Sequence, residues 1–323
     1  FDTDASTPDV IGDVELPPDV EQPPTAAPGS VLRYEEANSY GGGYAETVTY
    51  AGGDTFEVDN LAFDGLNVYT GSNLQMNGGP VGEVGGYMLF DAEVTVPDFL
   101  TGGPINQIAD YHAIYGESSV LVGGEPRSRF AIIRTGGYTD FGFGGFIYER
   151  NGTVVLPAAG QTGQAGYSGR YAGMRVFSGI GGLEFTEGDL EIAIDFGDFN
   201  ETNAVSGRLS NRIAFDESGT LVLLGIDGEA GELPLPDLHF VIQDSYDTLN
   251  SNGELAGLVN STYLDPLNEL QDYENGFYYG IIAGDTTSGD GGELVGILVF
   301  QSEDPRYENV GVQETGGFIL LRN

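Results

Sequence analysis

The segment that decides the fold is Leu190-Glu191-Ile192-Ala193-Ile194-Asp195-Phe196, in which a large apolar residue occupies every second position. Successive side chains of a β-strand point to opposite faces, so this alternation places the four large apolar side chains on one face and the two carboxylates on the other. The segment is therefore predicted to be a strand with one face in a core and the other toward water.

Seven further segments in the C-terminal half are also predicted to be β-strands. With the first they give eight predicted strands, at 167–176, 190–196, 205–215, 238–243, 254–264, 276–282, 293–300 and 316–322. Eight antiparallel strands can close into a barrel that side chains fill and that leaves no sheet edge exposed. Asp265 as an N-cap followed by Pro266 predicts one short helix, with Leu267 and Leu270 on its apolar side.

The preceding part of the chain consists of shorter β-like segments separated by glycine, aspartate and asparagine. They lie at 44–50, 55–63, 87–96, 108–115, 129–134 and 145–156. Long loops are expected at 70–86 and 97–106. We therefore expect an all-β chain, with a smaller antiparallel β domain at 31–164 and an eight-stranded antiparallel barrel at 165–323.

Residues 1–30 combine six prolines with acidic residues and few large apolar ones, which predicts an extended tether. Its own apolar side chains are too few to offset the entropy of ordering it. We therefore expect it to pack in extended form against the body of the protein or against another subunit, through the small apolar set of Val10, Ile11, Val14 and Leu16.

The composition excludes several kinds of chemistry. With 50 acidic and 11 basic residues the formal charge is −39, which disfavours nucleic acid and anionic membrane surfaces as partners. Every basic residue is arginine and cysteine is absent, so lysine nucleophiles, thiol catalysis, disulfides and thiolate metal sites are excluded. No base, nucleophile or metal cluster stands out in the pattern, so we expect a protein that is not an enzyme.

Three stretches of the C-terminal half resemble the transferrin-binding protein B family, surface lipoproteins of Gram-negative bacteria. Residues 167–173 (YSGRYAG) are similar to the opening barrel strand of that family, and 189–199 followed by 205–209 (VSGRL) to a strand pair within it. The most specific likeness lies in the closing strands, at 276–280 (GFYYG), 293–296 (ELVG) and 314–318 (ETGGF).

This resemblance covers about residues 165–323 and implies a single handle-plus-barrel lobe, in which 31–164 form the handle. It also implies a lipoprotein held at the outer membrane by a lipid anchor that is not visible in this sequence. No transferrin-facing motif of the family can be matched residue by residue, so transferrin is not carried over as the ligand.

Two groups of aromatic and imidazole side chains are candidate ligand-binding residues. Tyr111, His112 and Tyr115 lie close together in a strand-like segment, and imidazole and phenolate both bind iron or haem. The alternative is an ordinary hydrogen-bonded strand histidine; His239, between Leu238 and Phe240, is expected to face solvent. The second group would form an apolar binding patch if exposed together, or part of the core if the side chains alternate inward: Tyr138, Phe141, Phe143 and Phe146.

A glycine-rich acidic loop is a candidate Ca²⁺ site through Asp285, Asp290 and Glu293, because carboxylate oxygens are the ligands that Ca²⁺ prefers. Their spacing is not that of an EF-hand loop. The alternative is a solvated acidic loop.

These patterns together favour a surface-exposed binding protein, located at the cell outer membrane surface or outside the cell. It would capture a nutrient, such as haem, a metal complex or a carrier protein, for an outer-membrane receptor. The alternative is a structural or adhesive surface protein that self-associates through residues 1–24. A transmembrane porin competes for the location, but the predicted strands carry charge on the face that would meet lipid.

Overall fold

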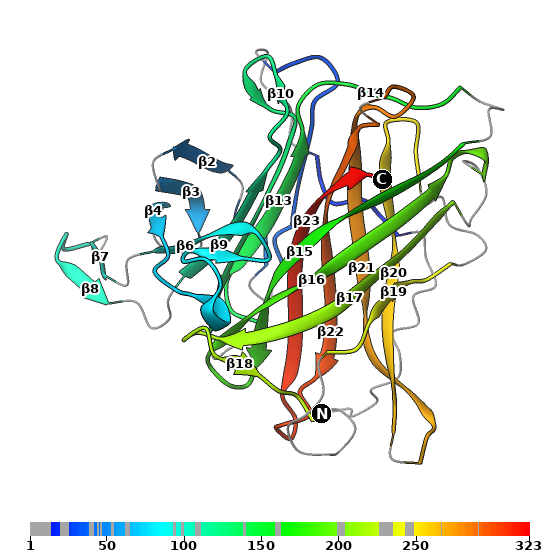
Figure 1. Ribbon diagram of the computed structural model, residues 1–323. Helices are drawn as coiled ribbons and strands as arrows, with labels where there is room; N and C mark the ends of the chain where they lie inside the picture. Colours follow the sequence, from blue (N-terminus) through cyan, green and yellow to red (C-terminus); the bar gives the residue numbers. More distant parts are fainter. Residues whose placement is uncertain are drawn as a thin grey trace.

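The computed structural model describes most of the chain in two antiparallel sheets that lie side by side (Figure 1). Among the described residues no helix has the length and apolar character needed to cross a membrane. The residues described are 14–19, 26–38, 42–43, 45, 47–52, 55–61, 65–92, 95–97, 100–106, 111–137, 140–158, 163–198, 204–225, 235–242, 249–265, 267–289 and 291–323.

The C-terminal sheet is the predicted closed eight-stranded barrel. Its strands are β15 (Gln164–Ser178), β16 (Leu183–Asp195), β17 (Val205–Asp216), β19 (Leu238–Phe240), β20 (Glu254–Leu264), β21 (Leu270–Asp285), β22 (Glu293–Glu303) and β23 (Gly311–Arg322). Each pairs antiparallel with the next along the chain, and β23 pairs with β15 to close the ring. All eight predicted strands are confirmed.

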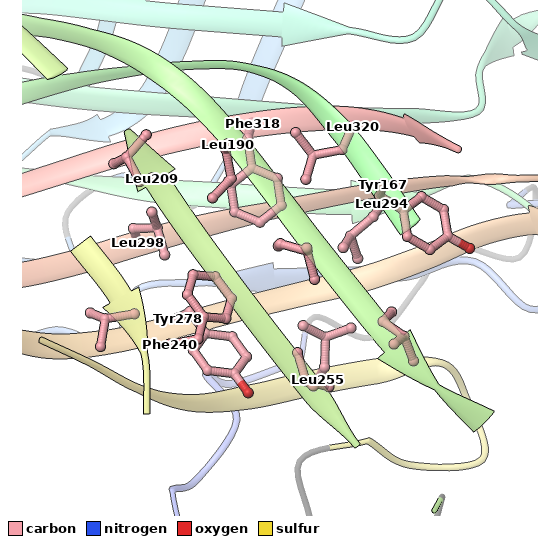
Figure 2. Packing of buried hydrophobic residues seen from close by; sticks show 14 of the residues in the cluster. Tyr167, Leu190, Leu209, Phe240, Leu255, Tyr278, Leu294, Leu298, Phe318 and Leu320 are labelled. Atoms are coloured by element: carbon pink, nitrogen blue, oxygen red, sulfur yellow. The ribbon is translucent and has the colours of Figure 1, made fainter. Parts of the chain in front are cut away.

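Alternation in β16 fills the barrel interior as the sequence predicts. Leu190, Ile192 and Ile194 are buried in the main core cluster, while Glu191 between them is exposed. Figure 2 shows this cluster, in which residues from strands far apart in the sequence meet inside the barrel. Burying each side chain of this size contributes about 1.5–3 kcal/mol, so the interior side chains hold the ring closed.

The N-terminal sheet is a curled handle-like sheet. In spatial order its strands are β1 (Val31–Tyr34), β13 (Gly144–Arg150), β12 (Ser128–Thr135), β9 (Tyr111–Glu117), β6 (Tyr87–Ala92), β4 (Gly65–Gly71), β3 (Thr55–Leu61) and β2 (Thr47–Gly52), with β5 (Glu83–Val84) beside β6. Two small hairpins lie apart from it, β7–β8 (Thr95–Pro97 and Pro104–Asn106) and β10–β11 (Leu121–Val122 and Glu125–Pro126). The sheet confirms the expected antiparallel architecture, while the domain boundaries at 30 and 164 stay a prediction.

One face of the handle sheet packs against the outside of the barrel. Ile114, Phe130 and Phe146 share a buried cluster with Met174 and Val295 of the barrel strands. The other face has a cluster of its own, which includes Tyr111, Tyr115 and Ile133. The handle is therefore joined to the barrel by an apolar layer of side chains.

Several details of the handle differ from the sequence prediction. The strand expected at 87–96 is divided into β6 and β7, and part of the loop expected at 97–106 is β8. Strands β1 and β4 were not expected, and part of the loop expected at 70–86 forms a 3₁₀ turn (Met76–Gly78) and β5. The strand expected at 145–156 is divided into β13 and β14 (Val154–Val155), because Gly152 adopts a positive φ of 91° between them. Strand β14 pairs in parallel with β21 of the barrel.

The helix predicted after Asp265 is wrong. The Asp265 side chain instead accepts hydrogen bonds from the backbone N–H groups of Leu267 and Glu269, at 2.9 and 2.8 Å. Pairing of β20 with β21 continues up to Leu264 opposite Leu270, and the Asp265 N–H donates to the Glu269 carbonyl at 2.9 Å, so the connection is the turn of a hairpin. Aspartate here starts a hairpin turn, and the short strand β18 (Leu221–Val222) likewise forms a hairpin with the end of β17.

The tether packs along β1 where it is described. The carbonyl of Pro17 accepts a hydrogen bond from Arg33 Nη1 at 2.8 Å, and that of Pro18 accepts one from the Tyr34 N–H at 3.3 Å. Val14 and Leu16 are half-buried, whereas Val10 and Ile11 lie outside the described residues. Self-association through residues 1–24 stays a prediction.

Candidate functional site

A row of four side-chain amides crosses the outside of the barrel. Asn260 of β20 lies directly opposite Asn275 of β21, Asn275 opposite Gln301 of β22, and Gln301 opposite Gln313 of β23. We call these four residues the amide row. Neighbouring strands are about 4.8 Å apart, so the row is about 14 Å long.

The alternation of the strands explains why the amides face outward. Their sequence neighbours Glu274, Phe300 and Glu314 are buried inside the barrel, and adjacent residues of a strand point to opposite faces. Asn260, Asn275 and Gln313 are accordingly half-buried and Gln301 is exposed. The row continues to His239, which lies opposite Asn260 and is exposed, as predicted.

An apolar row runs parallel to the amide row, two residues away from it on each of three strands. It consists of Leu258, Phe277 and Val299, which lie directly opposite one another on β20, β21 and β22. All three are only half-buried. Phe277 stacks beside Tyr279 with ring centroids 6.3 Å apart and an interplanar angle of 16°. The barrel therefore presents a polar stripe next to an apolar stripe.

The segment after β1 forms a wall over these two rows. The Glu35 N–H donates to the Phe146 carbonyl at 2.9 Å, which fixes this segment on the handle sheet. Glu35 and Asn38 line two adjoining hollows, of about 450 and about 590 Å³, that both include Gln301 and Gln313. Together the hollows form one groove between the wall and the barrel, which we call the amide groove.

Arg134 of β12 closes one end of the amide groove and is neutralised there. Its Nη1 lies 3.0 Å from Glu35 Oε2, and its Nη2 donates to Thr315 Oγ1 of β23 at 2.8 Å. Phe141 lines the same end. Burial, with a further contribution from Glu35, raises the pKa of Tyr279 to about 12, so the phenol behind the groove stays neutral over the physiological range.

The amide row is free to bind a ligand. Within the part of the chain that the structure describes, none of its four amide groups hydrogen-bonds to another protein group. Each amide carries two N–H donors and an acceptor oxygen, so the row offers both halves of a hydrogen bond at every strand. The amide groove can therefore hold a polar molecule that also has an apolar face.

The predicted residues around His112 are divided between two faces of the handle. Tyr111 and Tyr115 are buried on the face away from the barrel, where the Tyr115 hydroxyl donates to Glu117 Oε2 at 2.8 Å. His112 is buried on the barrel side, with Nδ1 2.7 Å from Asp91 Oδ1 and its ring against Phe185 at 5.3 Å. The structure does not bring these three side chains together as one set of ligands.

Of the predicted aromatic patch, Phe141 alone is seen to reach the amide groove. Phe143 is half-buried and its N–H donates to Thr135 Oγ1 at 3.0 Å, while Phe146 is buried between handle and barrel. Tyr138 lies outside the described residues.

The predicted Ca²⁺ ligands are engaged elsewhere where they are described. Glu293 is buried, with its oxygens 3.0 Å from Arg127 Nη2 and accepting from the hydroxyls of Ser118 at 2.8 Å and Ser128 at 2.7 Å. Asp285 accepts hydrogen bonds from the Thr287 hydroxyl at 2.6 Å and from the Thr287 N–H at 2.8 Å, which together lower the pKa of Asp285. Asp290 lies outside the described residues. Among the described histidine, aspartate and glutamate residues no group of three or more is placed to hold a metal ion.

The sequence prediction missed the amide row because the strands are longer than the pattern indicates. Asn275, Gln301 and Gln313 each lie just outside the strands predicted at 276–282, 293–300 and 316–322, and only Asn260 lies inside one. The row would have been found if each predicted strand had been lengthened to include the neighbouring positions where polar and apolar residues alternate. The strands reach that length because the closed ring gives their ends hydrogen-bonding partners.

No family model matches this chain, and none of the curated proteins does. Solved structures similar to it include a double mutant of the vaccine antigen transferrin-binding protein B from Haemophilus parasuis Hp5, at 12% identity over 85% of this chain and 53% of that one, with a TM-score of 0.34. A mutant of the Actinobacillus pleuropneumoniae H49 antigen gives 10% identity over 64% of this chain and 79% of that one, with a TM-score of 0.29. Intact transferrin-binding protein B, with N and C lobes, gives 10% identity over 83% and 64%, with a TM-score of 0.33.

The chain thus spans about half to two thirds of the length of the H. parasuis protein and of the intact two-lobe protein. The closed eight-stranded barrel beside a curled handle-like sheet is the arrangement that the sequence resemblance led us to expect.

Proposed function

We propose that this protein is a non-enzymatic binding protein of the cell surface, which captures a nutrient in the amide groove and passes it to an outer-membrane partner. The observation that carries the proposal is the amide row, four hydrogen-bonding side chains aligned across four strands and free of protein partners in the described structure. Polar side chains that converge without satisfying one another are typical of ligand sites.

The groove supports this function better than the His112 region does. The amide groove is open and has the volume of a small-molecule site, at about 450 and about 590 Å³ for its two hollows. The His112 ring is buried beside Asp91 and packed on Phe185. Haem ligation at His112 would require the handle to separate from the barrel, whereas the groove requires no such rearrangement.

Composition supports the location. A formal charge of −39 keeps an exposed protein soluble, and salt outside the cell screens the repulsion among its carboxylates. Digestion of intact producing cells with an added protease tests this part of the proposal. We expect the chain to be removed while cytoplasmic proteins survive; survival of the chain on intact cells would overturn a surface location.

Binding at the groove is tested with a blocking variant. The full chain and Gln301→Trp are heated with each member of a panel that comprises haem, a ferric siderophore complex, neutral oligosaccharides and short peptides. Gln164→Trp is the matched control, because Gln164 is also an exposed amide on a barrel strand but lies outside the groove.

We expect at least one probe to raise the melting temperature of the native chain and of the control but not of Gln301→Trp. Binding that stabilises only the folded state must raise that temperature. If no probe does so, or if the variant responds like the native chain, the groove is not the site and the proposal is wrong.

A further inference from the structure

We infer that the amide groove binds an uncharged polyhydroxylated ligand, a neutral oligosaccharide, which lies across strands β20 to β23. The inference rests on the proposed binding function and names the class of its ligand. Three properties of the groove lead to it: the chemistry of the amide row, the apolar row beside it, and the compensation of charge at its wall.

Amides and sugar hydroxyls have complementary hydrogen-bonding groups. A hydroxyl donates one hydrogen bond and accepts others, and a side-chain amide carries both donors and an acceptor. In the amide row Asn275 and Gln301 lie at the centre, flanked by Asn260 and Gln313 on the outer strands. A ligand with hydroxyls repeated along its length can therefore bond to the row at each strand spacing of about 4.8 Å.

The apolar row matches the other side of a sugar ring. Pyranose rings carry hydroxyls at their edges and C–H groups on their faces, so a sugar site needs a polar stripe and an apolar stripe in parallel. Phe277 presents a half-buried ring in this stripe, and its stacking on Tyr279 fixes the orientation of the ring. Phe141 supplies a second aromatic side chain at the Arg134 end of the groove.

The charges of the groove favour a neutral ligand. Among the described residues that line the groove, the two charged ones, Glu35 and Arg134, form an ion pair at 3.0 Å, so neither is left to attract a ligand charge. The protein as a whole carries a formal charge of −39, which repels anionic ligands from the groove mouth. A site selective for a cation supplies carboxylates, whereas the described lining of this groove supplies the amide row and one carboxylate that is already paired.

An extended peptide fits the groove less well. Peptides that bind to sheets commonly add a strand to a free edge. Strands β20 to β23 have neighbours on both sides, because the barrel is closed, and they offer side chains rather than unpaired backbone groups. The face of a closed sheet with alternating polar and apolar rows is better suited to a glycan.

Calorimetric titration of the full chain tests the inference with unbranched neutral oligomers of glucose, mannose and N-acetylglucosamine. An oligogalacturonate serves as the anionic counterpart. We expect at least one neutral oligomer to bind and the anionic one to bind at least tenfold more weakly. Asn275→Leu and Gln301→Leu should each weaken binding about tenfold, because each removes hydrogen bonds to the ligand.

Two further variants separate a sugar site from a general loss of structure. Phe277→Ala should weaken binding at least tenfold while Phe277→Tyr, which keeps the ring, binds like the native chain. The matched control Gln164→Leu should bind unchanged, and circular dichroism verifies that every variant is folded.

Three results would overturn the inference. One is that no neutral oligomer binds, another that Asn275→Leu and Gln301→Leu bind it as well as the native chain, and the third that the anionic oligomer binds as tightly. If haem or a peptide raises the melting temperature of the native chain but not of Gln301→Trp, while no sugar binds, the binding function stands and the sugar class is wrong. If no probe binds, both fail.

Discussion

The inside and the outside of the barrel carry polar side chains at neighbouring positions of the same strands. The inner side chains bond to one another, whereas in the described structure the outer ones do not. Inside, Glu274 and Glu314 are both bonded to Arg212. Outside, their sequence neighbours Asn275 and Gln313 belong to the amide row and have no partner among the described residues. Adjacent residues of one strand are thus structural on one face and available on the other.

The inner group is an ion network sealed from water. Arg212 donates to Glu274 at 2.6 and 2.8 Å and to Glu314 at 2.9 Å, and its guanidinium lies 4.9 Å above the Phe300 ring. Burial alone would lower the pKa of Arg212, but the two carboxylates raise it above its ordinary value. Tyr171 adds a hydroxyl that donates to Glu314 at 2.8 Å.

The difference teaches that polarity within a strand does not identify a binding site; the available partners do. Buried charges that have partners hold the fold together, and removing one partner leaves the other charge buried without compensation. Amides at an open groove contribute little to folding, since water satisfies them before and after. The predictions below break or sharpen this contrast, in order of expected effect on stability.

The largest effect is expected inside, from Arg212→Met. The substitution removes the only ion-pair partner that the described structure gives to the buried Glu274 and leaves Glu314 with Arg175, whose Nε lies 3.7 Å from it. Breaking a buried pair in this way costs about 3–5 kcal/mol. The free energy of unfolding in urea measures the loss. The control is Arg208→Met on the same strand. Arg208 is exposed and pairs with the half-buried Asp237 at the surface, so this substitution should change the free energy of unfolding by no more than about 0.5 kcal/mol. Equal effects of the two variants would refute the contrast.

Alkaline pH should destabilise the protein through tyrosines on both faces. Burial raises the pKa of Tyr167 inside, and of Tyr279 outside, from 10.0 to about 12. The folded state therefore keeps these protons after the unfolded state has lost them, so stability is unaffected below about pH 10 and falls between about pH 10 and 12. Each group contributes on the order of 2–3 kcal/mol to that fall.

Urea unfolding at a series of alkaline pH values measures this dependence. Tyr167→Phe and Tyr279→Phe should each make the slope shallower, since each removes one proton that only the folded state retains. Glu35→Gln should lower the pKa of Tyr279 and leave that of Tyr167 unchanged, because Glu35 contributes only to the former. An unchanged slope in both phenylalanine variants would show that other groups control the alkaline transition.

A smaller effect is expected at the glycine pair of β23, where the two faces approach their neighbours most closely. A Cβ on Gly317 would overlap the ring of Phe130 in the handle, and one on Gly316 would overlap Tyr171 inside the barrel. Gly317→Ala and Gly316→Ala should each cost about 1–3 kcal/mol, which is typical of overpacking. Thermal unfolding measures both; a neutral Gly317→Ala would show that the handle can shift away from the barrel.

The smallest effect on stability is expected in the amide row. Asn275→Leu and Gln313→Leu remove no described hydrogen bond, so each should change the free energy of unfolding by less than about 0.5 kcal/mol. The same urea titration checks this. A loss of more than about 1 kcal/mol would show that these amides support the fold and would weaken their assignment to a ligand.

Much of the barrel could be predicted from local pattern. The alternation at 190–196 depends only on which residues are apolar, and water enforces it wherever a strand has one face in a core. The helix expected after Asp265 failed because an aspartate that caps a helix also starts a turn, and the pairing of Leu264 with Leu270 decided between the two.

The candidate site could be predicted much less well. The aromatic and imidazole side chains at 111–115 are distinctive in their chemistry and were therefore predicted as ligands, yet their strand directs them to two faces of the handle. The amide row has no distinctive residue at any one position. It exists only because four strands, separated by up to 53 positions along the chain, are aligned in register.

By itself, then, the sequence determined the all-β class, the number of barrel strands, the outward direction of His239 and the acidity of the surface. These follow from residue-by-residue polarity, which acts over neighbouring positions. Only the tertiary structure decided that Asn260, Asn275, Gln301 and Gln313 form one row and that the segment at Glu35 covers it. Strand register and the seating of the handle on the barrel depend on packing between distant segments, and no local pattern records them.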